Sequence, residues 1–238
     1  MKLMRNFVTA ASSLLVAACT LNAHADTIAW THWTAGTAGN PGSATGTVTS
    51  SLYGTITVTY SGQTSGLLIS YPSWTPASTF TGGIVGNAPP AINNSIGIEG
   101  GQPYTETITF SHAIVDPIFA IWSLGAPGTP ATFNFTTSDF NVLGGGPSAE
   151  FGGTAIVKSG SSINGSEGNG IVQFNGTYSS LSFTTPNFEN FYAFTIGEDA
   201  TLTDGGTPPP PAIPEPSTLV LLGTGILAAA GAIRRRLS

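Results

Sequence analysis

The residue types of a hydrolase triad lie close together at one place in this chain, where Ser111, His112 and Asp116 follow a predicted strand. A triad needs a nucleophile beside a base and an orienting acid, whereas adjacent residues of a strand point to opposite faces. No Gly-x-Ser-x-Gly segment presents a nucleophilic serine. His32 is the one other histidine beyond the first 25 residues. We therefore predict no catalytic residues and place His112 on the surface or at a loop end.

Carboxylates offer a second kind of chemistry, because a glycosidase uses two of them across a cleft. The candidates are Glu99, Glu106, Glu150 and Glu189, and their spacing does not select a pair. The single cysteine, Cys19, lies in an N-terminal apolar stretch, so the chain after it has no thiol nucleophile, thiolate metal site or intrachain disulfide. We predict that the protein is not an enzyme, with a secreted hydrolase as the less favoured alternative.

Oxygen ligands for calcium occur in two segments, Asn164–Asn169 and Gly197–Asp199. Calcium binds carboxylate and carbonyl oxygens on loops, but neither segment matches an EF-hand or a nonapeptide repeat. Two histidines with a carboxylate are the alternative, a zinc site. Solvated turn residues are the simpler interpretation, so we predict no metal and no cofactor.

Aromatic residues could form a platform for sugars. Trp30 and Trp33 lie near the start of the chain after the N-terminal apolar stretch, and Tyr71–Trp74 contains a proline. Packing in or at the rim of a core is the alternative role of tryptophan in a β-domain. The abundant threonine and serine residues have two interpretations as well, the polar face of a sheet or acceptors for O-glycosylation.

Charge is unevenly distributed. Charged residues make up 8% of the chain, and five of the six basic residues lie at its two ends. The region from Asp26 to Ile213 keeps Lys158 and eleven of the twelve acidic residues, a net charge of −10. Without a basic patch this region cannot neutralise phosphates, which argues against nucleic-acid binding.

The N-terminus has the pattern of a secretion signal. Lys2 and Arg5 precede an apolar stretch, and Ala23-His24-Ala25 has the small-x-small pattern that signal peptidase accepts. We predict cleavage after Ala25. The alternative is lipidation of Cys19, because Val16–Cys19 resembles a bacterial lipobox.

The C-terminus carries a second signal. A stiff proline-rich linker leads to Pro214-Glu215-Pro216. The apolar run that follows, counted from Ser217 to Ile233, has 17 residues and spans about 26 Å as a helix, which is a minimal membrane span. Arg234, Arg235 and Arg236 then hold the end in the cytoplasm.

These three elements in this order closely resemble the PEP-CTERM sorting domain. The resemblance covers about Ile213 to Ser238. It implies that Pro214, Glu215 and Pro216 are recognised by an exosortase, a membrane-embedded enzyme that cuts near the motif and passes the protein outward. It also implies a Gram-negative-type bacterium that makes exopolysaccharide.

The region between the two signals is rich in strand patterns. Thr55–Tyr60 and Thr105–Phe110 alternate polar and apolar residues, and Pro117–Trp122 is continuously apolar, as in a strand buried on both faces. Further strands are expected at Thr132–Thr136, Gly170–Phe174, Tyr178–Phe183 and Phe191–Ile196. Glycine-rich loops are expected at Gly36–Gly46, Gly144–Pro147 and Ser159–Asn169, with a long loop at Gly82–Gly101.

Many short strands without helices predict an all-β fold, an antiparallel β-sandwich or jelly roll; a β-solenoid would show a regular repeat. We divide the chain into a signal peptide (1–25), a β-sandwich domain (26–206), a proline-rich linker (207–213) and a sorting signal with a transmembrane helix (214–238). We expect a non-enzymatic bacterial protein, processed by signal peptidase and exosortase. It would insert transiently in the inner membrane, then reach the cell surface or extracellular matrix and associate with exopolysaccharide in a biofilm. A carbohydrate-binding module, with or without calcium, is the alternative.

Overall fold

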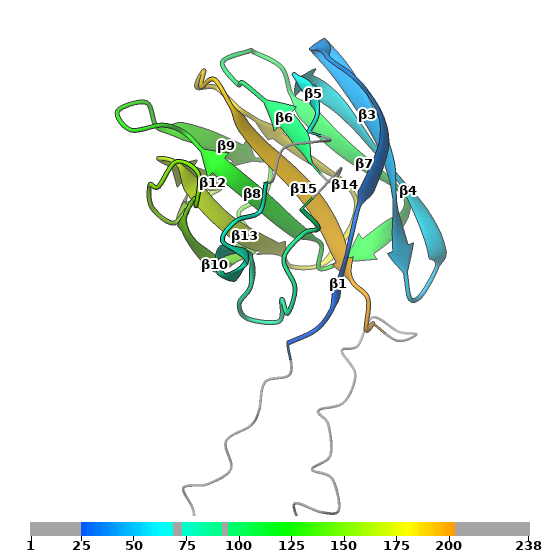
Figure 1. Cartoon of the computed structure of the whole chain (residues 1–238). Coiled ribbons are helices and arrows are strands. Elements are labelled where there is room, and N and C mark those ends of the chain that lie inside the picture. The colour runs from blue at the N-terminus through cyan, green and yellow to red at the C-terminus, as the bar shows by residue number, and fades with distance from the viewer. Residues whose placement is uncertain (1–24, 69–72, 92–94, 203–238) are drawn as a thin grey trace, which may run out of the picture.

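A computed structural model describes residues 25–68, 73–91 and 95–202. These residues form two antiparallel sheets, and no α-helix occurs among them (Figure 1). One short 3₁₀ helix, η1 (Ala77–Phe80), interrupts the strands. The prediction of an all-β fold is therefore confirmed.

The first sheet has seven strands, of which β15 is central and pairs with β8, β6 and β1. Its order is β10 (Phe140–Pro147), β13 (Gly168–Phe174), β8 (Ile118–Leu124), β15 (Tyr192–Asp199), β6 (Ile96–Ile98) and β5 (Gly66–Leu67), with β1 (Ile28–Trp30) beside β15.

The second sheet has eight strands. Its order is β11 (Val157–Ser159), β12 (Ser162–Gly165), β9 (Ala131–Phe135), β14 (Thr177–Thr184), β7 (Glu106–Val115), β4 (Gly54–Thr64), β3 (Gly39–Ser50) and β2 (His32–Thr37).

The two sheets pack face to face, the arrangement of a β-sandwich, around a core of aromatic rings. Phe119 of β8 lies 5.5 Å from Phe133 and 5.8 Å from Phe183 of the opposite sheet, measured between ring centroids. It also stacks on Phe194 of the neighbouring strand β15, at 4.9 Å. Edge-to-face contacts of this kind stabilise a core beyond the area that they bury.

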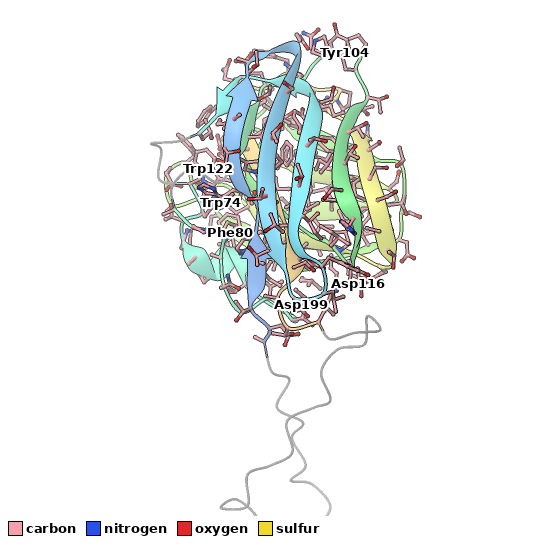
Figure 2. The ribbon with its side chains drawn as sticks, turned by 90° about the vertical axis from the view of Figure 1, so that its right-hand side faces the viewer. Trp74, Phe80, Tyr104, Asp116, Trp122 and Asp199 are labelled. Atoms are coloured by element: carbon pink, nitrogen blue, oxygen red, sulfur yellow. The ribbon has the colours of Figure 1, made fainter. Side chains whose placement is uncertain are left out.

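Strand β8 is buried on both faces, as its continuously apolar sequence predicted. Phe119 points into the core between the sheets, whereas Trp122 belongs to a second apolar cluster on the outer face of the seven-stranded sheet. Trp74 and Phe80, from the segment around η1, belong to the same cluster and lie near Trp122 (Figure 2). The seven-stranded sheet is therefore covered on its outside as well.

Three of the expected loops are strands instead. Gly36–Gly46 lies mostly in β2 and β3, and Gly144–Pro147 is the end of β10. Ser159–Asn169 contains the end of β11, all of β12 and the start of β13, joined by short turns at 160–161 and 166–167. The reason is close approach of other backbone atoms: a Cβ atom on Gly46 would lie 2.6 Å from the carbonyl oxygen of His32. Gly46 therefore serves packing within the sheet, whereas Gly160, with a φ of +61°, lies in the turn between β11 and β12. The segment Gly82–Gly101 is mainly irregular, as expected, but contains β6.

Candidate functional site

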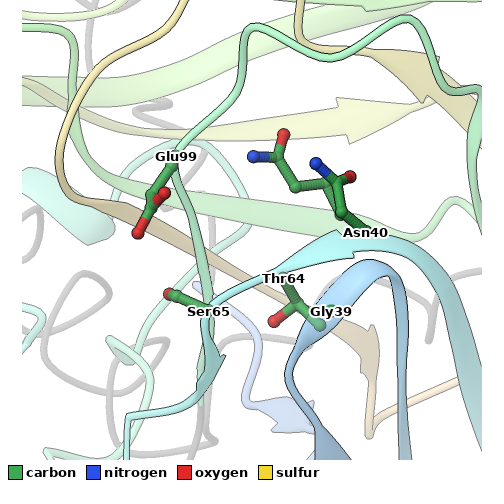
Figure 3. Close-up of a pocket in the computed structure, with 6 residues that line it drawn as sticks. Gly39, Asn40, Thr64, Ser65 and Glu99 are labelled. Carbon is green, nitrogen blue, oxygen red and sulfur yellow. The ribbon is translucent and has the colours of Figure 1, made fainter.

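A polar pocket of about 190 Å³ lies at one end of the sandwich, where β3 begins and β4 ends. It is lined by Gly39, Asn40, Gln63, Thr64, Ser65 and Glu99 (Figure 3). The two sheets are tied together beside it, because the Thr64 hydroxyl and the Ser65 N–H both donate to the carbonyl oxygen of Gly97, at 2.9 and 3.0 Å. These two hydrogen bonds hold the backbone of the lining residues Thr64 and Ser65 in place.

Next to the pocket lies a buried hydrogen-bond network centred on Glu106, which is 1% exposed. The Tyr60 hydroxyl lies 2.7 Å from the Glu106 carboxyl and 2.5 Å from the carbonyl oxygen of Gln63, and the Thr185 hydroxyl donates to the other Glu106 oxygen. Burial raises the pKa of Glu106 to about 7, although the hydrogen bonds from Thr185 and Tyr60 oppose the rise.

The two acceptors around Tyr60 explain why a protonated Glu106 fits this network. A tyrosine hydroxyl has one hydrogen to donate. When Glu106 is protonated, its hydrogen is donated to the Tyr60 oxygen, and Tyr60 donates its own to Gln63. Burial also raises the pKa of Tyr60, and the nearby Glu106 raises it further, so the phenol stays neutral.

The outer face of the eight-stranded sheet carries rows of hydroxyl groups, which we call the hydroxyl face (Figure 2). Thr45, Thr59, Thr109 and Ser180 lie opposite one another on β3, β4, β7 and β14, and Ser43, Ser61, Thr107 and Ser182 form a parallel row. Neighbouring strands are about 4.8 Å apart, so the hydroxyls form a regular array. The abundant threonine therefore forms the polar face of a sheet, one of the two expected roles.

The residues of the expected triad have separate structural roles. The Ser111 hydroxyl accepts the Thr57 N–H at 2.9 Å, and the Asp116 carboxylate accepts the Gly176 N–H at 2.5 Å. The exposed His112 ring stacks on Tyr53, with 5.4 Å between ring centroids. His32 is exposed on β2. Within the described ranges, these contacts tie Ser111, His112 and Asp116 to three different partners and do not join them into one site.

The four candidate glutamates differ in environment. Glu99 is exposed in the pocket, and Glu106 is buried in the network beside it. Glu189 is 7% exposed, and burial raises its pKa. Partial burial would raise the pKa of Glu150, but hydrogen bonds from Thr75, Ser148, its own N–H and Trp122 outweigh that effect and lower it. Glu99 is thus the carboxylate best placed to meet a ligand.

The two calcium candidates lie in or between strands and use their oxygens within the protein. Asn164 accepts from Thr132 at 2.8 Å, and Glu167 accepts from Ser123 at 2.5 Å. Glu198 and Asp199 are buried residues of β15, so the expectation of a loop there is wrong. In the described part of the chain, no three His, Cys, Asp or Glu residues group as metal ligands would.

The tryptophans pack in the interior and form no platform. Trp33 is 2% and Trp74 3% exposed, and Trp30 is also buried. The Trp33 indole N–H donates to Thr195 at 3.2 Å, and Trp74 packs edge-on against Phe80 at 5.1 Å. Tyr71 lies outside the described residues. Exposed aromatic residues that the sequence did not single out are Tyr53, Tyr104, Phe151 and Phe188.

The described domain begins and ends at the same end of the molecule, opposite the pocket (Figures 1 and 2). Ala25 is exposed, and Ala200 N–H donates to Thr27 O at 2.9 Å, which joins the two terminal segments. Ala23, Cys19 and the sorting residues Pro214, Glu215, Pro216, Arg234, Arg235 and Arg236 lie outside the described residues. In the part of the chain that the structure describes, no helix is long and apolar enough to cross a membrane.

Comparison with known proteins assigns the C-terminal segment. Residues 212–236 match the PEP-CTERM protein-sorting motif, which confirms the resemblance stated from the sequence. Such a motif implies processing by an exosortase and export across the membrane to the cell surface. No curated protein and no solved structure matches the chain.

Proposed function

We propose that this protein is non-enzymatic and that, after processing, it resides at the cell surface or in the extracellular matrix in association with exopolysaccharide. The match of residues 212–236 to the sorting motif carries the proposal, since it assigns the route that the protein takes. In this route signal peptidase cuts after Ala25, residues 219–233 form a transient helix in the inner membrane, and the exosortase recognises Pro214, Glu215 and Pro216.

A non-enzymatic role is supported by how the reactive side chains are used. Ser111 and Asp116 bind backbone N–H groups, and His112 lies against Tyr53. General acid–base or nucleophilic catalysis needs such groups within hydrogen-bond reach of one another and of a substrate. The contacts that Ser111, His112 and Asp116 make instead stabilise the strands and turns in which they lie.

Association with polysaccharide is supported by the hydroxyl face. Its two rows contain only threonine and serine, so the surface that they form has no charge to attract or repel an ionic partner. Hydroxyls both donate and accept hydrogen bonds, as do the hydroxyls of a sugar chain. An uncharged hydroxylated polymer is the partner that this surface suits best, either bound to it or attached to it as an O-linked glycan.

The processing steps are tested by intact-mass spectrometry of the extracellular protein from cells with and without the exosortase. We expect a chain that begins at Asp26 and lacks residues 219–236, and we expect Glu215→Ala to leave the protein with the cells. Asp204→Ala, an acidic residue nearby but outside the motif, serves as the matched control and should not change export. Extracellular protein that still contains residues 219–236 would contradict the proposal.

Association is tested by fractionating the extracellular polysaccharide and measuring how much protein remains with it. The double variant Thr59→Lys/Thr109→Glu places a charged but mutually attractive cross-strand pair on the hydroxyl face, which the sheet tolerates. We expect it to release the protein from the polysaccharide, whereas Thr154→Lys, on an exposed loop, should not. A glycan stain of the same band reports whether the hydroxyls carry sugars.

A further inference from the structure

The polar pocket offers the mixture of hydrogen-bonding groups that a sugar requires. Its side chains include the amides of Asn40 and Gln63, the hydroxyl of Ser65 and the carboxylate of Glu99 (Figure 3). Amides and hydroxyls donate and accept, and a carboxylate accepts only. At about 190 Å³ the cavity is smaller than the roughly 300–1,000 Å³ typical of pockets for drug-sized ligands, so one sugar unit fits its size.

Gln63 supplies hydrogen-bonding capacity that the described residues do not use. Its side chain is 7% exposed, and its amide oxygen has no hydrogen-bond partner among them. Buried polar atoms are almost always paired, so the Gln63 amide is under-satisfied in the wall of the pocket that it lines. The Gln63 carbonyl accepts from Tyr60, which fixes the backbone from which the side chain extends.

One exposed aromatic residue bonds to a residue that lines the pocket, and a second precedes a residue that does so. Tyr104 is 36% exposed, and its hydroxyl donates to the carbonyl oxygen of Asn40 at 3.0 Å. Phe188 is 55% exposed, and the N–H of the next residue, Glu189, donates to the carbonyl oxygen of Glu99 at 2.7 Å. Flat aromatic surfaces next to a few polar groups are typical of sites for ligands with one apolar and one polar face.

Charge selects among the sugars that could bind. The pocket contains Glu99 and no basic side chain. Lys158, the one lysine of the region from Asp26 to Ile213, donates to the carbonyl oxygens of Ser138 and Phe140 instead. A uronate, sulfate or phosphate group in the pocket would meet a carboxylate without a compensating cation, which disfavours acidic sugars.

The pocket lies at the end of the domain opposite the last described residues. Tyr104 lies at the pocket end of the domain, and Asp199 lies at the opposite end (Figure 2). Strand β4, whose end lines the pocket, has 11 residues and so spans about 35 Å. About one strand length therefore separates the pocket from the end of the domain at which Asp199 lies.

We propose that this pocket binds one sugar unit of a neutral polysaccharide, with Asn40, Gln63 and Glu99 bonding to its hydroxyls and Tyr104 beside its apolar face. The choice of a polysaccharide rests on the proposed function, and the pocket adds the site and the class of sugar.

The test is a glycan array, followed by calorimetric titration of the best neutral glycan, with the exported protein as purified from culture. The array carries neutral glycans beside uronate- and sulfate-bearing ones. Glu99→Gln removes an acceptor, Tyr104→Ala removes the aromatic surface, and both sites are exposed, so the fold is kept. Tyr53→Ala is the matched control, because Tyr53 is 52% exposed at the opposite end of the β3–β4 hairpin.

We expect neutral glycans to bind and each pocket variant to weaken binding at least about tenfold, while Tyr53→Ala does not. The pocket proposal is overturned if no neutral glycan binds, if only acidic glycans bind, or if Tyr53→Ala reduces binding as much as the pocket variants do. Array binding without retention in extracellular polysaccharide would overturn the proposed function alone. Retention without array binding would overturn the pocket alone.

Discussion

Glu106 should make the stability of this protein depend on pH in a direction opposite to that of most carboxylates. Its pKa is about 7 in the folded protein and about 4.5 when the chain is unfolded, because folding buries it. Between these values the folded state keeps a proton that the unfolded state has lost, so unfolding becomes easier as pH rises. The effect is complete just above pH 7 and amounts to about 3 kcal/mol.

The substitution Glu106→Gln tests this reasoning. The amide has the shape of the protonated carboxyl: its oxygen accepts from Thr185, and its NH₂ group donates to Tyr60. We expect the variant and the parent protein to have similar free energies of unfolding near pH 4. Near pH 8 the variant should be more stable by about 3 kcal/mol, since it has no carboxylate to bury.

The assay is urea denaturation at pH values from 4 to 8, with tryptophan fluorescence as the signal. Burial also raises the pKa of Glu189 and Glu198, so the parent and the variant both retain some slope, and the difference between their two curves is the quantity to compare. Glu99→Gln, an exposed carboxyl, controls for the loss of a charge. A difference between Glu106→Gln and the parent that stays constant across this range would refute the argument.

Three further substitutions test the packing of the domain by urea denaturation. Phe119→Ala should lower the free energy of unfolding by about 3–5 kcal/mol, because Phe119 contacts rings of both sheets; Phe151→Ala, at an exposed ring, should have a much smaller effect. Asn169→Ala should cost about 2–3 kcal/mol, since the buried amide bonds the Ser123 N–H and the Thr75 carbonyl, and an unchanged midpoint would contradict this role. Lys158→Met keeps the aliphatic stem but removes two hydrogen bonds and the ammonium 4.4 Å from the Phe140 ring centroid, so a loss of about 1 kcal/mol is expected, and no loss would show these contacts to be neutral.

The strands with clear patterns were predictable from the sequence. Thr55–Tyr60 alternates because β4 has one face in the core and one on the hydroxyl face, and Pro117–Trp122 is continuously apolar because β8 is covered on both sides. Gly144 was misassigned to a loop for a physical reason. It is a strand residue against which the segment of η1 packs, and a Cβ atom there would lie 2.4 Å from the carbonyl oxygen of Thr81.

The residues of the sorting motif are contiguous in sequence, so they could be identified from the sequence alone. The residues of the pocket could not be identified in this way. Asn40, Gln63 and Glu99 come from three strand ends that are separated in sequence and meet only when the two sheets pack together. Glu99 was one of four candidate glutamates, and nothing in its neighbours distinguished it from Glu106, which is buried. That difference arises from long-range packing, which no local pattern encodes.

The position of β15 has a consequence for the order of events during export. This strand is the last of the described domain to emerge from a translocation channel, yet it lies at the centre of its sheet, between β8 and β6, and also pairs with β1 from the start of the domain. The seven-stranded sheet cannot close until Asp199 has crossed the membrane. At that moment only residues 200–238 remain behind, so the sheet becomes complete only when little more than the linker and the sorting segment is left to follow.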